Sequence, residues 1–409
     1  MTFNKKTILD VPLDGQRILL RADYNVPLDN GKVADDYRIT QSLPTLQELR
    51  SRGCQIVICS HLGRPDGKPD PALSLAPVAE RLSDLLGEHV AFVPDCVGDR
   101  VVQTVKHLSS GQVVLLENVR FHPEEEANDD TFAKRLATDS GAQYFVQDGF
   151  GVVHRAHAST EAITHHVPSV AGLLLQKEIT AITAAMDNPK RPMVAIVGGA
   201  KISDKIKVLE RFVDLADQLI IGGAMANTFL KYKGYAIGKS EHEDGQEQVL
   251  RQIYGKALGK CTGNESVDEF LFLPTDVAVT TDLDAQEQRR TEVRTEDVAD
   301  DEYIVDIGSH TISHAIELLK GAGTVIWNGT MGVAEKKAFS NGSAYIADAL
   351  AQQHGSTTTI VGGGDTADFV LHWDPKKGGS FTHVSTGGGA SLDLMAGEKL
   401  PGVEALMDA

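Results

Sequence analysis

Arginine, histidine and acidic residues gather in the first half of the chain, most of them just after short apolar runs. The candidates for chemistry are Arg38, Arg64, Arg120 and Arg155, with His61, Asp23 and Asn25 beside them. Guanidinium groups bind phosphate and carboxylate oxygens in pairs, which a single ammonium group cannot do. One such arginine alone is better explained as a surface ion pair, worth roughly 0–1 kcal/mol. Four of them at adjacent strand ends favour a site for a small, multiply charged anion.

Glycine-rich segments play the corresponding part in the second half. They lie at Gly198–Lys201, Gly222–Asn227, Asn328–Gly332, Gly362–Thr366 and Thr386–Ser391. A glycine turn that opens a helix exposes backbone N–H groups and the positive end of the helix dipole, which suits phosphate. Lys201 and Lys205 could add charge for a polyphosphate, and Asp365 could hold Mg²⁺ that bridges phosphate oxygens. Tight strand–helix packing is the alternative explanation for each glycine turn.

Two common nucleotide-binding motifs are missing. The segment Gly234–Ser240 comes near to a Walker A loop but has three spacer residues where four are required. No G-x-G-x-x-G follows an apolar run, which argues against a nicotinamide-dependent dehydrogenase, an alternative that rests on architecture alone. No serine or cysteine nucleophile with a paired base is visible. An anion site and a polyphosphate site together predict direct in-line phosphoryl transfer, by positioning and charge stabilisation.

Short apolar runs, many of them β-branched, must position these residues. They lie at Ile18–Leu20, Gln55–Cys59, Val113–Leu116, Gln143–Val146, Val194–Val197, Gln218–Ile221, Phe270–Leu273, Thr324–Trp327 and Thr359–Val361. With helical patterns between them, they predict an α/β fold whose parallel sheets bind ligands at the carboxyl ends of the strands. Near the middle, apolar residues at helical spacing predict a helix over Leu175–Met186 that ends at Asp187-Asn188-Pro189. We expect this helix to connect two α/β domains of similar size.

The composition limits the partners. At about 150 residues per domain, 409 residues suggest two or three domains. The formal net charge is −18, of which Glu241–Glu302 contributes −11 (6 basic minus 17 acidic residues), and we expect a solvated surface of helices and loops there. This acidity argues against nucleic acid or an anionic membrane as partner. Without a leader-like start, an 18-residue apolar run or paired cysteines, we expect a cytoplasmic protein, and nothing requires more than a monomer.

Seven segments of the chain resemble the phosphoglycerate kinase family, from Arg21 to about Val403. The segments are SHLGRP at Ser60–Pro65, LENVRFHPEEE at Leu116–Glu126, HRAHAST at His154–Thr160, GGAKISDKI at Gly198–Ile206, GGAMANTFLK at Gly222–Lys231, GGGDTA at Gly362–Ala367 and STGGGASL at Ser385–Leu392. The resemblance implies reversible phosphoryl transfer between ATP and 3-phosphoglycerate, which gives ADP and 1,3-bisphosphoglycerate, with Mg²⁺ accompanying the nucleotide.

The resemblance also implies which residues form the sites. The phosphoglycerate would be held by Asp23, Asn25, Arg38, His61, Leu62, Gly63, Arg64, Arg120 and Arg155. The nucleotide would be surrounded by Gly199, Ala200, Lys201, Lys205, Gly308, Asn328, Glu335, Gly363, Gly364, Asp365 and Thr366. Arg38, Lys201 and Lys205 would be catalytic, Glu335 would meet the ribose, and Asp365 would be the metal ligand.

The implied fold is α/β, with two Rossmann-like domains, each a parallel sheet covered by helices, facing across a hinged cleft that closes for catalysis. The phosphoglycerate domain would span 1–172 plus a C-terminal return over 390–409, the hinge helix 173–188, and the nucleotide domain 189–389. The chain departs from the usual pattern at Gln147, Gly149, Thr330 and Ala334, which concerns nucleotide fit and hinge stiffness. A non-catalytic family member is the other alternative, although every charged site position is filled.

Overall fold

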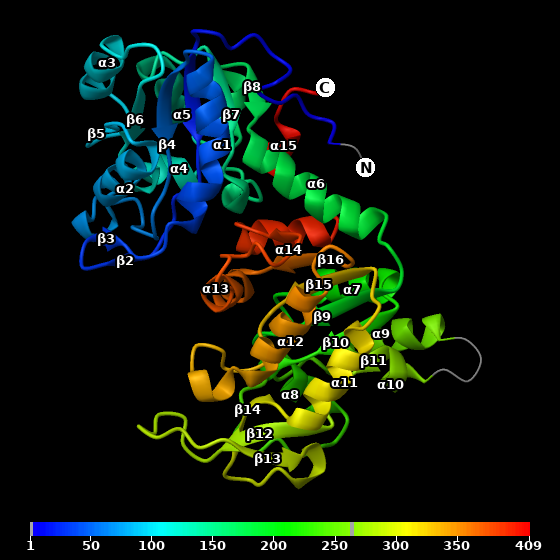
Figure 1. Ribbon diagram of the computed structural model, residues 1–409. Helices are drawn as coiled ribbons and strands as arrows, with labels where there is room; N and C mark the ends of the chain where they lie inside the picture. Colours follow the sequence, from blue (N-terminus) through cyan, green and yellow to red (C-terminus); the bar gives the residue numbers. More distant parts are fainter. Residues whose placement is uncertain (1–2, 262–265) are drawn as a thin grey trace. The chain divides into compact units, whose positions relative to one another are not determined.

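The computed structural model describes residues 3–261 and 266–409, which form two compact units (Figure 1). The first unit comprises Met1–Thr180 and Lys399–Ala409, and the second comprises Ala181–Glu398. Each unit is built around its own six-stranded parallel sheet. The expected α/β class with parallel sheets is therefore confirmed.

The sheet of the first unit has the strand order β5-β6-β4-β1-β7-β8. Its strands are β1 (Arg17–Arg21), β4 (Gln55–Cys59), β5 (Ala91–Val93), β6 (Val113–Leu116), β7 (Tyr144–Gln147) and β8 (Ser169–Ala171). The longer helices are α1 (Tyr37–Ser51), α2 (Ala76–Leu86), α3 (Asp99–Lys106) and α5 (Asp130–Asp139), and the shorter elements are β2 (Leu28–Asp29), β3 (Lys32–Val33) and α4 (Pro123–Glu126). Short 3₁₀ turns lie at Val119–Phe121, Phe150–Val152 and Ala162–His165.

Alternation along β1 shows why these strands are apolar throughout. Ile18 and Leu20 pack on one face with side chains of α1 and α2, whereas Leu19 packs on the other face with side chains of α3 and α5. Successive side chains of a strand point to opposite faces, so a strand covered by helices on both sides must be apolar at every position. This removes water from both faces and leaves the strand ends as the places for polar side chains.

The sheet of the second unit has the order β11-β10-β9-β15-β16-β17. Its strands are β9 (Met193–Val197), β10 (Gln218–Ile221), β11 (Leu271–Phe272), β15 (Thr324–Asn328), β16 (Thr358–Gly362) and β17 (His383–Val384). The helices are α7 (Ile206–Leu215), α8 (Gly223–Tyr232), α9 (Glu247–Lys260), α10 (Val267–Phe270), α11 (Ser309–Leu319), α12 (Asn341–Gln352), α13 (Gly364–Trp373) and α14 (Gly388–Met395). In this unit, α8, α11 and α13 begin directly after a strand, each with a glycine at its N-cap, and α14 begins at a glycine turn a few residues after β17.

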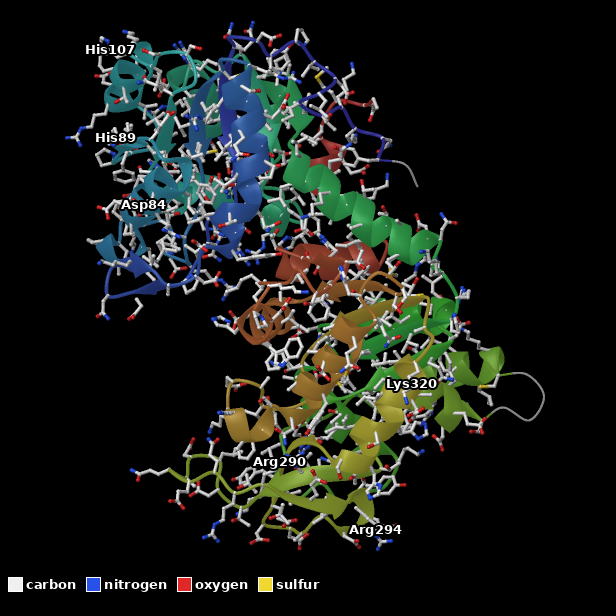
Figure 2. The ribbon with its side chains drawn as sticks, viewed as in Figure 1. Asp84, His89, His107, Arg290, Arg294 and Lys320 are labelled. Atoms are coloured by element: carbon white, nitrogen blue, oxygen red, sulfur yellow. The ribbon has the colours of Figure 1, made fainter. Side chains whose placement is uncertain are left out.

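The charge of the acidic stretch predicts only helices and loops, and this prediction is wrong. The stretch contains two strands of a three-stranded antiparallel sheet, β13-β12-β14, with β12 at Asp276–Thr280, β13 at Thr291–Arg294 and β14 at Tyr303–Ile307. Every residue of β12 is buried, and Val277 and Val279 form a small core. The neighbouring strand β13 is largely exposed, and Figure 2 labels Arg294 at its end and Arg290 just before its start. One buried central strand thus suffices to fold a segment that is strongly acidic on average.

Helix α6 (Leu173–Asp187) begins in the first unit and continues into the second. Asp148, just after β7, fixes its start, because one carboxylate oxygen accepts hydrogen bonds from the backbone N–H of Leu174 at 2.9 Å and of Leu175 at 3.2 Å. Within the described ranges, no helix is both long and apolar enough to cross a membrane.

The C-terminal return begins later than the sequence suggests. Residues 390–398 belong to the second unit, because α14 packs against α7, α13 and β16. The chain rejoins the first unit at Lys399, where α15 (Pro401–Glu404) follows and the backbone oxygen of Met407 accepts a hydrogen bond from the N–H of Lys6 at 2.8 Å.

Gly223 offers a test of the packing between strand-end loops. Its φ is +63°, and a Cβ there would lie 2.6 Å from the backbone nitrogen of Gly199. Gly321 has a φ of +76° with no atom near such a Cβ. We expect Gly321→Ala to lose about 1–2 kcal/mol of unfolding free energy from backbone strain alone, and Gly223→Ala to lose about 1–3 kcal/mol more. The measurement is urea unfolding followed by fluorescence, because both tryptophans, Trp327 and Trp373, lie in the second unit. Equal losses would contradict the close approach.

Candidate functional site

The loops after β1 and β4 bring predicted anion-site residues together in the first unit. Arg38, near the start of α1, donates from Nη1 to the carboxylate of Asp23 at 3.2 Å and to the backbone oxygen of Asn25 at 3.0 Å. The side-chain oxygen of Asn25 in turn accepts a hydrogen bond from the N–H of Gly63 at 2.9 Å. These bonds hold the half-buried guanidinium group of Arg38 in one orientation beside a buried carboxylate.

His61 is buried next to this group. Its Nδ1 lies 3.4 Å from Nη2 of Arg21 and 3.9 Å from a carboxylate oxygen of Asp23. Burial lowers the pKa of His61 well below its usual value, and the positive charge of Arg21 lowers it further. The ring is therefore neutral at pH 7 and offers a hydrogen bond rather than a positive charge.

The remaining basic residues come from the loops after β4, β6 and β7. Arg120 is buried, donates to the backbone oxygen of Gly63 at 2.8 Å and forms an ion pair with Glu126 at 3.1 Å. Arg155 is half-buried and its Nε lies 3.2 Å from Nε2 of His154. Arg64 is exposed, and Leu62 is buried beneath the loop. All the predicted residues of this site therefore lie at the carboxyl ends of strands or at the start of α1.

In the second unit, the strand-end loops pack so closely that only glycine fits between them. Gly329 has a φ of +101°, and a Cβ there would lie 2.2 Å from the backbone of Gly198. Gly198 and Gly199 donate backbone hydrogen bonds to Asn328 and Thr330 at 2.9 Å and 3.0 Å. Several glycines thus allow the loops to pack against each other. This role resembles tight strand–helix packing, the alternative to phosphate binding for the glycine turns.

Lys205 turns inward toward these loops. Its ammonium group donates to the backbone oxygen of Gly198 at 2.7 Å and to that of Asn328 at 3.3 Å. Burial lowers its pKa to about 8, although the nearby carboxylates of Asp365 and Asp204 act in the opposite direction. Lys201 is exposed. One lysine is thus held at the strand ends while the other extends into solvent.

Two pockets share Thr330, Glu335 and Asp365 in this unit. The first, of about 210 Å³, is also lined by Gly199 and Ala200 and continues over Tyr303, Val305 and Leu283, near the antiparallel sheet. The second, of about 590 Å³, lies along α13 and includes Phe369. A pocket with apolar walls at one end and exposed carboxylates at the other fits a ligand that has both an aromatic and a polyanionic part, once a cation accompanies the anion.

None of the remaining predicted nucleotide residues lines either pocket, but each lies within two positions of a residue that does. Asn328 is fully buried, and neither polar atom of its side-chain amide has a hydrogen-bond partner among the described residues. That amide lies within 3.4 Å of where a Cβ of Gly363 would be. Thr366 accepts a hydrogen bond from the N–H of Gly329 at 2.6 Å. Gly364 and Asp365 are exposed in the first turn of α13. Gly308 lines neither pocket; the side chain of Asp276 lies where its own would be.

Comparisons with known proteins agree over nearly the whole chain. A family model described as phosphoglycerate kinase matches residues 8–398. The chain belongs to the phosphoglycerate kinase family. Phosphoglycerate kinases of Pelotomaculum thermopropionicum and Chloroherpeton thalassium are 45% and 47% identical to it over 406 and 408 residues, covering 99% of this chain and 99% and 100% of theirs. The chain is therefore an enzyme of glycolysis that transfers a phosphoryl group between ATP and 3-phosphoglycerate.

Solved structures of the family have the same fold. The phosphoglycerate kinase of Coxiella burnetii superimposes with a TM-score of 0.82 at 38% identity, and that of Pyrococcus horikoshii with a TM-score of 0.83 at 30% identity. Each match covers 98% of both chains.

Sequence reasoning missed the residues that support the anion site. Arg21, the last residue of β1, is fully buried, and so are Glu125 of α4 and Ser159. Glu125 and Ser159 lie within motifs that resemble the phosphoglycerate kinase family, but no pattern distinguished them from their neighbours. A polar residue that is buried by its fold carries no sequence signal apart from the motif around it.

The four departures from the usual family pattern lie at or beside the sites. Thr330 lines both pockets and Ala334 lines the larger one. A Cβ on Gly149 would lie 3.2 Å from the backbone nitrogen of Asp23. Glycine at this position therefore lets the loop after β7 pack closely against the backbone of Asp23. Gln147 is buried, and its side-chain oxygen accepts a hydrogen bond from the N–H of Gly149 at 3.2 Å.

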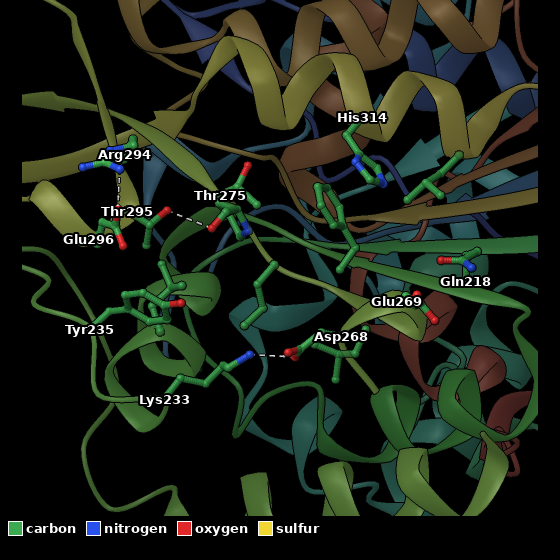
Figure 3. A pocket seen from close by; sticks show the side chains of 16 residues that line it. Gln218, Lys233, Tyr235, Asp268, Glu269, Thr275, Arg294, Thr295, Glu296 and His314 are labelled. Carbon is green, nitrogen blue, oxygen red and sulfur yellow. Dashed lines mark hydrogen bonds and ion pairs between the residues drawn. The ribbon is translucent and has the colours of Figure 1, made fainter. Parts of the chain in front are cut away.

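A further pocket of about 660 Å³ lies along the edge strand β11, apart from these loops (Figure 3). Its floor includes Phe272, which stacks on His314 at a centroid distance of 4.5 Å. Lys233 is paired with Asp268 at 2.6 Å, and Arg294 is paired with Glu296 at the same distance. These two cations already have counter-charges, so we assign no ligand to this pocket.

The lowered pKa of Lys205 predicts how nucleotide affinity depends on pH. A polyphosphate favours the charged ammonium form, which is nearly complete at pH 7 and is lost as the pH rises through about 8. The Kd for ATP should therefore rise by up to about tenfold between pH 7 and pH 9.

Lys205→Arg should remove most of this rise, because a guanidinium group stays charged throughout. The control is Lys207→Arg, an exposed lysine on α7 that pairs with Glu398 at 2.9 Å. Calorimetric titration of the two variants and the parent protein measures the Kd at each pH. The same pH dependence in all three proteins would show that Lys205 does not control it.

Proposed function

We propose that the anion site of the first unit binds the 3-phosphoglycerate. The observation that carries this is the cluster around Arg38, whose guanidinium group is held by Asp23 and Asn25 beside the neutral His61. Arg64, Arg120 and Arg155 supply positive charge for a phosphate, and Asp23 and Asn25 supply acceptors for a hydroxyl group.

The nucleotide belongs, in this proposal, to the second unit. The apolar end of the smaller pocket suits a purine base, Glu335 suits the ribose hydroxyls, and Lys201 and Lys205 suit the phosphates. The first turn of α13 adds free backbone N–H groups at Gly364 and Asp365, together with the positive end of the helix dipole. Gly308, which directly follows Ile307 of the smaller pocket, remains part of the proposed nucleotide site.

Mg²⁺ fits the exposed carboxylate of Asp365. Among residues 3–261 and 266–409, no group of three or more His, Cys, Asp or Glu side chains could hold a metal ion by itself. Magnesium is commonly held by one or two carboxylates together with the oxygens of a nucleotide, so a single aspartate at the phosphate end is sufficient. When bound, the ion would neutralise charge on the phosphate oxygens.

For the transfer, a carboxylate oxygen of the acid attacks the terminal phosphorus of ATP, the bond from that phosphorus to the ADP oxygen breaks, and ADP leaves. Arg38 on one side and Lys201 and Lys205 on the other would stabilise the charge on the transferring group. Because acid and nucleotide are assigned to different units, a reacting distance of about 3–3.5 Å requires the units to approach one another during catalysis. We further propose that the enzyme acts as a monomer in the cytoplasm, without nucleic acid or a membrane as partner.

Arg38→Ala should lower kcat by about 10³-fold or more and change the Kd for ATP little, because this arginine stabilises charge mainly in the transition state. Arg38→Lys should restore little, since an ammonium group lacks the planar fork. ADP formation from ATP, Mg²⁺ and 3-phosphoglycerate, with a sample that lacks the acid, measures kcat. Arg81→Ala is the matched control, an arginine in α2 paired with Asp36 at 2.6 Å. A kcat within tenfold of the parent enzyme would exclude the role assigned to Arg38.

Asp365→Ala should weaken the binding of ATP with Mg²⁺ and raise the magnesium concentration needed for half-maximal rate, while the Kd for 3-phosphoglycerate stays unchanged. The reason is that the two ligands are assigned to different units. Calorimetric titration with each ligand measures both effects, and Asp348→Ala, an exposed aspartate of α12, is the control. Equal losses for the two ligands would show that the assignment of ligands to units is wrong.

A further inference from the structure

A buried chain of polar side chains runs behind the anion site, from Glu125 to His61. A carboxylate oxygen of Glu125 lies 2.6 Å from the hydroxyl oxygen of Ser159, and that oxygen lies 2.7 Å from Nε of Arg21. The other end of the same guanidinium group lies 3.4 Å from Nδ1 of His61. Glu125, Ser159 and Arg21 are each fully buried, and His61 is 3% exposed.

The donor and acceptor in each of these contacts follow from the chemistry of the groups. Arginine has only donors, so Ser159 accepts from Nε of Arg21 and Nδ1 of His61 accepts from Nη2. The hydroxyl proton of Ser159 then points to Glu125, which also accepts from the N–H of Ser159 at 2.9 Å. Ser159, held by Glu125, and the backbone oxygen of Ala22, which accepts from Nη1 of Arg21 at 2.6 Å, therefore orient the guanidinium group that faces His61.

The charges around His61 keep its ring neutral. The groups that face it are one carboxylate, Asp23, at 3.9 Å from Nδ1, and several cationic or basic side chains: Arg21, Arg38, Arg120 and His157. Burial and these charges hold the pKa of His61 well below its usual value. A neutral imidazole whose Nδ1 accepts a hydrogen bond carries its single proton on Nε2.

The Nε2 atom of His61 is the free end of the chain. It has no hydrogen-bond partner within the described parts of the protein, and it is not among the enclosed polar atoms, unlike Nδ1 of His157. In this tautomer Nε2–H offers a donor to an anionic ligand. In the other tautomer the same position would present a lone pair to that ligand and repel it.

We propose that Glu125 and Ser159 are positioning residues that act through Arg21 to hold His61 in the Nε2–H tautomer, so that the ring donates a hydrogen bond to the phosphoglycerate. The inference rests on the proposed function for the identity of the ligand. The tautomer itself is a property of the protein without ligand and can be measured independently.

The experiment is nitrogen NMR of the full chain labelled with ¹⁵N-histidine. The chain has 14 histidines, so the signals of His61 are assigned by their loss in His61→Gln. In the parent protein we expect a protonated Nε2 and an unprotonated Nδ1. Ser159→Ala removes the hydroxyl relay and should give a mixture of the two tautomers, as should Glu125→Gln. Glu124→Gln, the same charge change at the exposed neighbour, should leave the signals unchanged. Thermal unfolding identifies any variant that does not fold.

Kinetics then distinguishes positioning from a merely structural role. Loss of one hydrogen bond to a charged ligand should raise the KM for 3-phosphoglycerate about tenfold in Ser159→Ala and Glu125→Gln. The KM for ATP should not change, and Ser159→Thr, which keeps the hydroxyl group, should recover the parent tautomer and part of the KM.

The outcomes separate the two proposals. A protonated Nδ1 in the parent protein, or an unchanged tautomer in both folded variants, would overturn the positioning role. If the tautomer shifts as expected but adding 3-phosphoglycerate leaves the Nε2 signal of the parent protein unmoved, the ligand assignment of His61 is wrong, and with it the donation step of this inference. A shifted tautomer together with a shifted Nε2 signal supports both.

Discussion

The parallel pairing of the central strands determines where every loop of the two sites begins. In the first unit, Arg21 at the end of β1 is paired in register with Cys59 of β4 and Gln147 of β7. In the second, Asn328 at the end of β15 is paired with Val197 of β9 and Gly362 of β16. Because all carboxyl ends meet at one edge, segments more than one hundred residues apart in the chain start their loops side by side. The sites follow from this register.

The same arrangement buries polar and charged residues at the ends of the strands. Helices cover both faces of each sheet, so a charged residue at the last strand position is cut off from water and needs a partner within the protein. Arg21 meets this need through Ser159 and Glu125. Asn328 is the opposite case, since its buried amide atoms find no partner in the described residues. A buried polar group without a partner costs free energy, and here that cost falls on the residue whose amide packs against Gly363.

The sequence predicted those elements whose residues form a clear local pattern. Five-residue apolar strands such as β4 and β9 and the connecting helix α6 were located closely, and the motifs marked the strand ends. The strands β5, β8 and β17 were missed, because two or three residues carry no periodicity of their own. The antiparallel sheet was hidden by the average charge of its segment. Glu125 could not be separated from Glu124 and Glu126, because only the fold decides which of three adjacent glutamates is buried.

The proposed anion site also reconciles a net charge of −18 with the binding of an anion. Each buried arginine has its own acidic partner, Glu126 for Arg120 at 3.1 Å and the more distant Glu125 for Arg21 at 3.9 Å. Repulsion between them persists nevertheless: after burial, the charge of Arg21 is the largest cause that lowers the pKa of Arg120. Converging arginines therefore destabilise the free protein, and an anion placed among them relieves that repulsion. Relief of this repulsion adds to the binding energy of the ligand, so the attraction for an anion arises from the local field and not from the charge of the whole chain.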